Sequence, residues 1–347
     1  MTETKILSLN HETIHHYKKC FDNNNSPKDL QVLNWQFFES GNKNFVDIEL
    51  DVDNDKIAAI YATFGVRLKI DTEIHLGCQS LDTITDLDYR GKGLFIKLAK
   101  DVYQKAKDDG VALVYGFPNG NSIHGFEKKL EWKVLDPVPF LIKPLKSSYF
   151  TKKFSSLSFL PNLNLSLTKY SKDKNYKIVE RLEFPEAVNS VWKSFSESIK
   201  VAVHRDKSYL DWRYIQKPFE NYKIAHCYDT NEQYIGFIVY TVKGKHGGKI
   251  AYIMEMVYDL KHPTASNKLL EYAISEIKKE QADCILSWCM NHSPSAKTYK
   301  KNFFISMPER FRPIELHFGV RSFQKQWDEI ITNRENWYLS YSDSDTV

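Results

Sequence analysis

The two halves of the chain present similar features in the same order. Residues 210–242 (LDWRYIQKPFENYKIAHCYDTNEQYIGFIVYTV) follow the pattern of residues 33–65 (LNWQFFESGNKNFVDIELDVDNDKIAAIYATFG). Three pairs of landmarks correspond at a nearly constant offset: Trp35 with Trp212, Asp86 with Asp259, and Phe126 with Tyr299. A repeat that spans a whole domain predicts two similar domains, for which a chain of 347 residues is long enough.

The first copy contains a strand, a glycine-rich turn, a helix and a second strand in succession. Residues 73–85 form a strand-like apolar run, and after the turn Arg90–Gly93 apolar residues recur at helical spacing up to Gly110. The apolar run Val111–Phe117 predicts a short buried strand. Such a crossover makes its two strands parallel. In the second copy, His262–Ala265 stands in place of the turn and lacks both glycines, so we expect a degenerate copy.

The turn Arg90–Gly93 is a candidate anion site. The first turn of a helix has backbone N–H groups without partners and carries a partial positive charge. Gly91 and Gly93 have no Cβ atom to hold a phosphate away, and Arg90 and Lys92 add charge and donors. The patterns G-x-x-x-x-G-K-S/T and G-x-G-x-x-G are absent from the sequence. The turn therefore predicts a site for the pyrophosphate of a ligand other than a nucleoside triphosphate or a dinucleotide. The alternative is a turn that is merely solvated.

The composition limits the classes of partner. A formal net charge of +4, with lysine and glutamate interspersed, argues against a broad basic face, and we expect no nucleic-acid partner. The sequence contains no apolar run of about 18 residues, so membrane insertion is not expected. The amino terminus lacks signal-peptide features, and the five cysteines form no C-x-x-C pair. These features predict a cytoplasmic protein with reduced thiols.

The turn lies within a longer pattern that resembles a known family. Residues 80–95 (SLDTITDLDYRGKGLF), 116–122 (GFPNGNS) and 126–132 (FEKKLEW) are similar to the GNAT superfamily of acyl-CoA-dependent N-acyltransferases. The resemblance is strongest to members in bacterial surface-polysaccharide biosynthesis. The pyrophosphate loop of the family, Gln/Arg-x-x-Gly-x-Gly/Ala, is matched by Arg90 and Gly93, whereas Phe95 stands at the last position.

The resemblance implies an α/β (α+β) fold of tandem GNAT-type domains. Each domain is expected to be a mixed, mostly antiparallel twisted sheet flanked by helices. Residues 1–145 would form the domain that carries the acetyl-CoA loop. Residues 146–175, rich in Ser, Asn and Lys, would form a linker. Residues 176–347 would form a degenerate GNAT-like domain that shapes the acceptor pocket.

The resemblance also implies which residues hold acetyl-CoA. In this family the strand before the loop splays from its neighbour, the pantetheine arm adds to it like an extra strand, and a backbone N–H polarises the thioester carbonyl. The cofactor-binding residues implied for this sequence are Leu81, Asp82, Thr83, Ile84, Thr85, Arg90, Gly91, Lys92, Gly93, Leu94, Phe95, Asn119 and Ser122. Asn119 has an alternative part as a turn residue that caps the following helix.

Acyl transfer to an amine requires a deprotonated amine and a proton for the leaving thiolate. Many family members use a tyrosine as the acid where this chain has Phe126, so His124 is the candidate here, with an inert surface histidine as the alternative. The ending WYLSYSDSDTV (337–347) alternates aromatic and apolar residues and predicts a docked strand. The resemblance implies that Asp343 and Asp345 bind the acceptor ammonium group or accept its proton, with a solvated acidic tip as the alternative.

Several further residues are candidates for acceptor binding. The segment HETIH (11–15) matches the zinc-protease pattern H-E-x-x-H, but no H-x-x-G-x-x-H extension follows, and we expect no metal site. We instead expect an amphipathic helix there, which borders the acceptor pocket if the chain is a GNAT protein. The candidate acceptor-binding residues are His15, His16, Trp35, His204 and Arg205. For Trp35 the alternative is core packing, and for the last two it is capping of a helix.

These expectations combine into one function and three alternatives. We expect an acetyl-CoA-dependent N-acetyltransferase whose acceptor is a nucleotide-linked amino sugar in surface-glycan biosynthesis; the acceptor rests on the resemblance alone. A Fem-type aminoacyltransferase would show a broad basic groove for charged tRNA. A peptide, protein or aminoglycoside acetyltransferase would have a more acidic acceptor pocket. A non-catalytic module, suggested by the missing hydroxyl at Phe126, would bind ligand without transfer.

Overall fold

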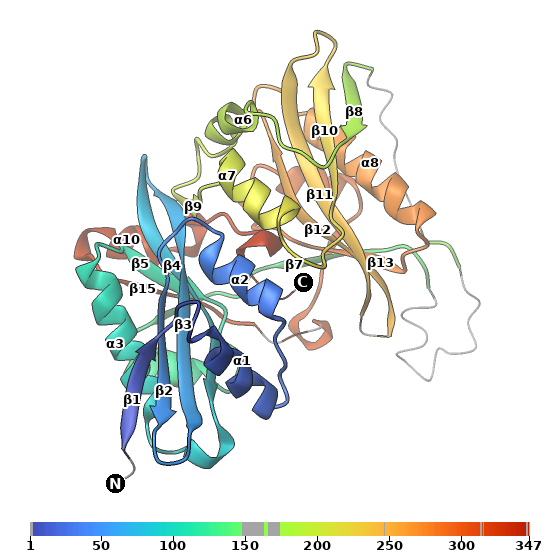
Figure 1. Cartoon of the computed structure of the whole chain (residues 1–347). Helices are drawn as coiled ribbons and strands as arrows, with labels where there is room; N and C mark the ends of the chain where they lie inside the picture. Colours follow the sequence, from blue (N-terminus) through green and yellow to red (C-terminus); the bar gives the residue numbers. More distant parts are fainter. Residues whose placement is uncertain are drawn as a thin grey trace.

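The computed structural model describes residues 3–147, 163–165, 174–245, 247–312, 314, 316–344 and 346. Within these residues the chain forms two mixed sheets with helices packed on their faces (Figure 1). The linker expected over residues 146–175 lies mostly outside the described residues. Among the helices that are described, none is both long and apolar enough to cross a membrane. All five cysteines are described, all are buried, and none forms a disulfide.

The first sheet is built mainly from the amino-terminal half. Its strand order is β1 (Thr4–Ser8), β2 (Phe45–Asp51), β3 (Lys56–Ile70), β4 (Glu73–Thr85), β5 (Leu113–Gly116), β15 (Phe318–Ser322) and β6 (Lys133–Leu135), and β9 (Val201–Val203) pairs with β3. The pair β4–β5 is parallel, and the other pairs are antiparallel. The connection from β4 to β5 contains α3 (Leu94–Asp108), which confirms the predicted crossover.

The second sheet repeats this plan. Its strand order is β14 (Ile305–Ser306), β7 (Phe140–Pro144), β13 (Cys284–Trp288), β12 (Gly248–Tyr258), β11 (Tyr234–Lys245), β10 (Lys223–Asp229) and β8 (Tyr176–Glu180). The parallel pair is β12–β13, and α8 (Ala265–Lys279) connects it. The shorter helices of this half are α6 (Val188–Phe195), α7 (Lys207–Leu210), α9 (Ala296–Lys301) and α10 (Asp328–Ile331). The internal duplication predicted from the sequence is therefore present in the fold.

The two sheets exchange strands between the halves of the chain. Beside the parallel pair of the first sheet lies β15, which comes from the carboxyl-terminal half, and it pairs with β5. Beside the parallel pair of the second sheet lies β7, which comes from the amino-terminal half, and it pairs with β13. Of the segments expected as two domains, residues 1–145 thus contribute β7 to the second sheet, and residues 176–347 contribute β15 and β9 to the first. The exchange interlocks the two halves.

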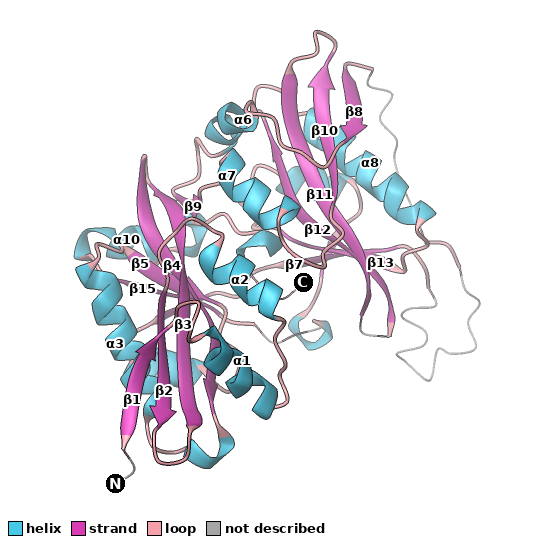
Figure 2. Cartoon of the chain, viewed as in Figure 1, coloured by secondary structure: helices cyan, strands magenta, loops and turns pink. Residues whose placement is uncertain are grey.

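Helices cover both faces of the first sheet (Figure 2). In β3, Ile60 and Ala62 belong to the apolar core that includes α1 (Ile14–Asn23) and α2 (Leu30–Phe38). The alternate residues Ala59 and Tyr61 belong to a second core that includes α3. Successive side chains of a strand point to opposite faces, so a strand that is apolar throughout is covered on both sides. The short helix α4 (Ile123–Lys129) adds its buried Phe126 to the core on the α3 side.

The carboxyl-terminal segment Trp337–Ser344 docks between the two sheets, where the end of the chain lies in Figure 1. Its aromatic residues are buried, as expected, but the predicted strand is wrong. Trp337 forms only an isolated bridge with Val201, and Tyr341–Asp343 is a 3-10 turn. The side chain of Ser340 accepts a hydrogen bond from the backbone N–H of Ser342, and a capping box closes the turn. These local bonds replace the ladder of a strand.

The two halves meet at Trp35 in α2 and Trp212 in the helical turn Asp211–Ile215. Their rings stack with centroids 4.6 Å apart and an interplanar angle of 10°. The Nε1–H of Trp35 donates to the carbonyl oxygen of Trp212 at 2.7 Å, and the Nε1–H of Trp212 donates to that of Trp35 at 3.0 Å. The two corresponding residues of the repeat therefore bind each other reciprocally, and both indole N–H groups are satisfied.

We expect Trp35→Ala to lower the free energy of unfolding by about 3–5 kcal/mol, because a large aromatic side chain is lost from a packed interface. Trp35→Phe keeps a ring for stacking but leaves the Trp212 carbonyl without its donor, so we expect a smaller loss of about 1–3 kcal/mol. Chemical denaturation followed by circular dichroism measures both. Leu182 is 68% exposed, so Leu182→Ala is the control. Equal stabilities of Trp35→Ala and Leu182→Ala would contradict the conclusion that the Trp35–Trp212 stack holds the two halves together.

Candidate functional site

A cavity opens where β4 and β5 part. Their pairing ends at Ser80 and Gly116. Beyond this point a cavity of about 570 Å³ lies between Leu81–Thr85 on one side and Phe117–Asn119 on the other. The splay expected from the family resemblance is present. We call this cavity the donor cleft. The predicted acetyl-CoA residues that line it are Leu81, Asp82, Thr83, Ile84, Thr85, Arg90, Phe95, Asn119 and Ser122.

The glycine turn lies next to the donor cleft and begins α3. Gly91 and Gly93 have φ angles of 78° and 76°, which residues with a side chain rarely adopt. A Cβ atom at either glycine would meet nothing within 4 Å, so the space above the turn is open. Gly93 is the N-cap of α3 and brings no side chain to cap its first N–H groups. The turn thus leaves backbone donors and open space together.

Only some of the side chains in and next to the glycine turn reach the donor cleft. Arg90 is exposed, lines the donor cleft and donates through Nε to the carbonyl oxygen of Thr85 at 3.4 Å. The Nζ atom of Lys92 lies 4.5 Å from the ring centroid of Tyr89. Gly91, Lys92, Gly93 and Leu94 do not line the donor cleft. Phe95 packs against Phe126 with ring centroids 5.1 Å apart, which places an apolar side chain beneath the turn as interpreted from the sequence.

A β-bulge shapes β4 at the mouth of the donor cleft. Ile60 pairs with Ile84 and Ala62 with Leu81, so Asp82 and Thr83 both stand opposite Tyr61. Asp82 has a φ angle of 48°, in the left-handed region. Bulges of this kind redirect a side chain and are frequent next to active sites.

The Asp82 carboxylate, redirected by the bulge, is held by three donors. It accepts from Lys28 Nζ at 2.6 Å, from the Tyr17 hydroxyl at 3.1 Å and from Gln36 Nε2 at 3.4 Å. The sequence analysis missed Lys28, Tyr17 and Gln36, because nothing in their local pattern connects them to β4.

A buried chain of hydroxyl groups ends in the donor cleft at Ser80. The Tyr61 hydroxyl lies 2.8 Å from Ser80 Oγ and 2.5 Å from the Tyr103 hydroxyl. The Tyr103 hydroxyl accepts from Trp132 Nε1 at 2.9 Å. Burial raises the pKa of Tyr61 and of Tyr103, so both stay protonated and able to donate. The sequence analysis also missed this chain, because its members come from β3, β4, α3 and the segment after α4.

His124 and Asn119 stand differently toward the donor cleft. The side chain of His124 is exposed, and it does not line the donor cleft. The Asn119 side chain accepts from the backbone N–H groups of Asn121 and Ser122 at 3.1 and 3.2 Å. Asn119 therefore supports the start of α4, as one of its two expected parts requires, and it also lines the donor cleft.

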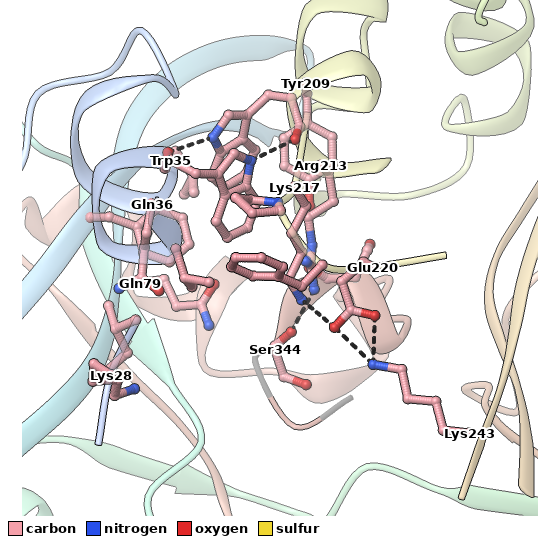
Figure 3. Close-up of a pocket in the computed structure, with 18 of the residues that line it drawn as sticks. Lys28, Trp35, Gln36, Gln79, Tyr209, Arg213, Lys217, Glu220, Lys243 and Ser344 are labelled. Atoms are coloured by element: carbon pink, nitrogen blue, oxygen red, sulfur yellow. Dashed lines mark hydrogen bonds and ion pairs between the residues drawn. The ribbon is translucent and has the colours of Figure 1, made fainter. Parts of the chain in front are cut away.

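A second cavity of about 410 Å³ lies between the two halves (Figure 3). We call it the acceptor cavity. Leu81 and Lys28 line both cavities, so the two adjoin at β4. Aromatic side chains from both halves form part of its wall: Trp35, Phe64, Tyr209, Trp212 and Phe219. Trp35 was a candidate for acceptor binding, and here it both lines this cavity and packs in the interface.

The acceptor cavity is rich in positive charge. Among the described residues that line it, five are cationic, Lys28, Arg213, Lys217, Lys243 and Lys245, and one is acidic, Glu220. Glu220 lies 2.6 Å from Lys243 Nζ and 3.6 Å from Lys217 Nζ. Burial alone would raise the pKa of Glu220, but the hydrogen bond from Lys243 and the nearby lysine charges bring it below its ordinary value. Glu220 is therefore ionised, and the cations still outnumber it.

Four of the other candidate residues lie away from both cavities. In α1, His15 is exposed and His16 is half-buried, and neither lines the donor cleft or the acceptor cavity. His204 accepts from Trp192 Nε1 through Nδ1 at 3.1 Å. Arg205 is fully buried and donates to Glu255 at 2.5 Å and to Asp343 at 2.6 Å.

The cluster around Arg205 assigns a structural part to two candidates. Arg205, Glu255 and Asp343 have no exposed side-chain surface. Burial raises the pKa of Asp343, and the charge of Arg205 opposes this shift. We therefore reassign Asp343 and Arg205 from substrate chemistry to the buried anchoring of the carboxyl-terminal segment, because neither side chain reaches a cavity. Asp345 lies outside the described residues.

The second half has a filled cleft at the corresponding place. The parallel pairing of β12 and β13 ends at Ile253 and Ser287, as that of β4 and β5 ends at Ser80 and Gly116. The cavity left there measures only about 10 Å³, and Tyr338 and Ser340 of the carboxyl-terminal segment are among its lining residues. The chain itself thus occupies the space that remains open in the first half.

We expect Arg205→Met to lower the free energy of unfolding by about 3–5 kcal/mol, since Glu255 and Asp343 would stay buried without their counter-charge. Thermal and chemical denaturation measure the change. Arg181 pairs with Glu183 at 3.8 Å on the surface, so Arg181→Met is the matched control, with an expected loss below about 1 kcal/mol. A stability equal to that of the control would show that the cluster does not anchor the segment.

Comparison with known proteins agrees with this geometry. Residues 8–134 match the family model described as "Acetyltransferase (GNAT) domain". No curated protein sequence matches the chain. A probable N-acyltransferase from Enterococcus faecalis is similar in structure, with a TM-score of 0.62 at 12% identity over 93% of this chain and 73% of that one.

Two further solved structures are similar over most of the chain. Saccharomyces cerevisiae N-myristoyltransferase with bound myristoyl-CoA has a TM-score of 0.58 at 12% identity, over 93% of this chain and 79% of that one. A GCN5-related N-acetyltransferase from Anabaena variabilis has a TM-score of 0.65 at 11% identity, over 93% of this chain and 74% of that one. The predicted fold class, tandem GNAT-like α+β domains with mixed, mostly antiparallel sheets, is confirmed.

Proposed function

We propose that this chain, whose residues 8–134 match a GNAT acetyltransferase domain, is an acetyl-CoA-dependent N-acetyltransferase. The acceptor in this proposal is the amino group of a nucleotide-linked amino sugar, as in surface-glycan biosynthesis. The observation that carries the proposal is the junction of the donor cleft and the acceptor cavity at Leu81 and Lys28. Direct transfer requires both reactants to be held together in one place.

The residues that line the donor cleft, and those of the glycine turn beside it, suit acetyl-CoA. Acetyl-CoA supplies an activated thioester. The open N–H groups at Gly91 and Gly93, with Arg90 beside them, suit a pyrophosphate. The strand Leu81–Thr85 has lost β5 as a neighbour beyond Ser80 and can pair with an extended arm.

Acyl transfer at the junction of the two cavities moves protons as well as the acyl group. When the amine nitrogen forms its bond to the acyl carbon, the carbon–sulfur bond breaks, the nitrogen loses a proton and the thiolate gains one. Asp82 and Lys28 form a charged pair at 2.6 Å where the cavities adjoin, and they orient the approach of a polar acceptor. Ser80, backed by the Tyr61 and Tyr103 hydroxyls, offers a hydrogen-bond donor to the leaving sulfur.

The charge of the acceptor cavity favours an anionic acceptor over the alternatives. A polycationic aminoglycoside would meet five cations and one carboxylate. A Fem-type enzyme would need a broad groove for tRNA, whereas these cations converge on a cavity of about 410 Å³. A nucleotide-linked amino sugar brings phosphates to the cations and its amine to the donor.

We expect the native protein to bind acetyl-CoA in the micromolar range and the double variant Arg90→Ala, Gly93→Val to lose this binding. The variant removes a donor and places a branched side chain where φ is 76° and a phosphate must approach. Isothermal titration calorimetry measures the affinity, and myristoyl-CoA in parallel tests the acyl length.

The matched control for the loop variant is Arg181→Ala, Gly110→Val. It also removes one exposed arginine and one glycine with positive φ, at 81°, but Gly110 lies at the other end of α3. Equal losses in both variants would mean that folding, rather than the turn, was disturbed. No binding of either acyl-CoA to the native protein would overturn the donor assignment.

We expect Ser80→Ala to lower kcat by about tenfold to a hundredfold with little change in the KM for acetyl-CoA, because the lost donor acts on the leaving group. Steady-state release of free thiol, with a panel of nucleotide-linked amino sugars as acceptors, measures this. Ser190→Ala is the control, since the Ser190 hydroxyl bonds to the carbonyl oxygen of Ala187 and Ser190 lines neither cavity. A rise in KM alone would show that Ser80 only binds the donor.

A further inference from the structure

Three lysines from the carboxyl-terminal half line the acceptor cavity. Lys243 and Lys245 belong to β11 and are two residues apart, so both project from the same face of the strand. Lys217 lies in the loop that leads to β10 and also lines the cavity. In Figure 3, Lys243 lies on the opposite side of the cavity from Lys28, which adjoins the donor cleft. Lys243 is therefore at the end away from the junction, and Glu220 joins it to Lys217.

The negative charge at this end does not balance the positive charge. In the part of the lining that the structure describes, Glu220 is the acidic residue, and it is shared between Lys243 at 2.6 Å and Lys217 at 3.6 Å. The ammonium group of Lys245 donates to the carbonyl oxygen of Thr346 at 3.2 Å, which is a neutral acceptor. Burial and the charge of Lys243 lower the pKa of Lys245. An added anion would relieve this repulsion.

The chemistry of the cations distinguishes a phosphate from a carboxylate. Arginine pairs a carboxylate through its planar fork, but Arg213 is engaged with the carbonyl oxygens of Ser342 and Ser344 at 3.0 and 2.8 Å. Lysine binds a phosphate as a point charge, and three lysines match the several negative charges of a diphosphate better than the single charge of a carboxylate. The arrangement therefore favours a phosphate.

An exposed aromatic ring stands beside these lysines. Phe219 lines the acceptor cavity, is 71% exposed, and has a φ angle of 60°. For a bulky residue this backbone conformation is strained and occurs where the surrounding structure demands it. An exposed ring next to a phosphate site provides a stacking surface for a planar base.

We propose that Lys217, Lys243 and Lys245 form a subsite for the phosphate groups of a nucleotide-linked acceptor, and that Phe219 stacks on its base. The inference rests on the proposed function and assigns the residues that select the acceptor. The phosphates bound at this end would direct the rest of the acceptor along the cavity toward Leu81 and the donor cleft.

The first test is calorimetric titration of uridine diphosphate into the full-length protein saturated with acetyl-CoA. We expect Lys217→Gln, Lys245→Gln to weaken this binding at least tenfold, while the Glu220–Lys243 pair stays intact. The control is Lys249→Gln, Lys279→Gln, which neutralises two exposed lysines of the same half and should leave the affinity unchanged. An unchanged affinity in the cavity variant, or displacement of acetyl-CoA by uridine diphosphate, would overturn the subsite.

The second test separates the base from the phosphates. We expect Phe219→Ala to weaken binding of uridine diphosphate about threefold to tenfold and to leave binding of inorganic diphosphate unchanged, because only the former can stack. Phe303→Ala is the matched control, since Phe303 is 46% exposed and has a φ angle of 61° but lies outside the acceptor cavity. Equal losses for both ligands, or for both variants, would contradict stacking on Phe219.

These titrations require no acetyl transfer, so the two proposals fail separately. Binding of uridine diphosphate at the lysines with no transfer to any amine would refute the proposed enzyme and support the subsite. Transfer to an amine acceptor that lacks phosphate, with no binding of uridine diphosphate, would support the acetyltransferase and refute the subsite.

Discussion

The reciprocal stack of Trp35 and Trp212 is the contact on which the arrangement of the two halves depends. Each indole N–H is bound to the backbone of the other residue, so the pair specifies an orientation as well as a distance. The strands β7 and β15 each pair within the sheet of the other half, so the backbone itself also links the two halves. Because both tryptophans also line the acceptor cavity, the contact that joins the halves is also a wall of the candidate site.

The duplicated fold carries one open cleft because the carboxyl-terminal segment fills the other. The strands part at the same place in both sheets, after Ser80 in β4 and after Ile253 in β12. In the second half the residues around Tyr338 and Ser340 close this gap, and the buried Arg205 cluster holds them there. A buried charge cluster is costly unless every charge is paired, so the segment is held by several partners at once. The second half is thereby left to shape the acceptor cavity.

Much of the donor cleft was predictable because its signal is local. The RGKG turn, the strand before it and the helix after it are contiguous, and their spacing predicted the parallel crossover and the open N–H groups. The expectation that Leu81–Thr85 line the cleft came from the family resemblance. The same reasoning misplaced residues whose environment is set at long range. From the sequence, Asp343 and Arg205 were expected to contact substrate, but they are buried together. The carboxyl-terminal segment alternates like a strand, but it contains a capped turn. His124 lies on the correct short helix, yet its side chain is exposed.

The sequence by itself determined most of the elements, the duplication and the glycine turn at the start of α3, because helical and strand periodicity, glycine positions and the repeat can be read along the chain. Only the tertiary structure decided which side chains face a common space. The pairing of Asp82 with Lys28 and Tyr17, the hydroxyl chain behind Ser80 and the lysines of the acceptor cavity join residues from distant parts of the chain. Such groupings follow from how the strands register, where β4 bulges and how the two halves pack, and none of these is written in a local pattern.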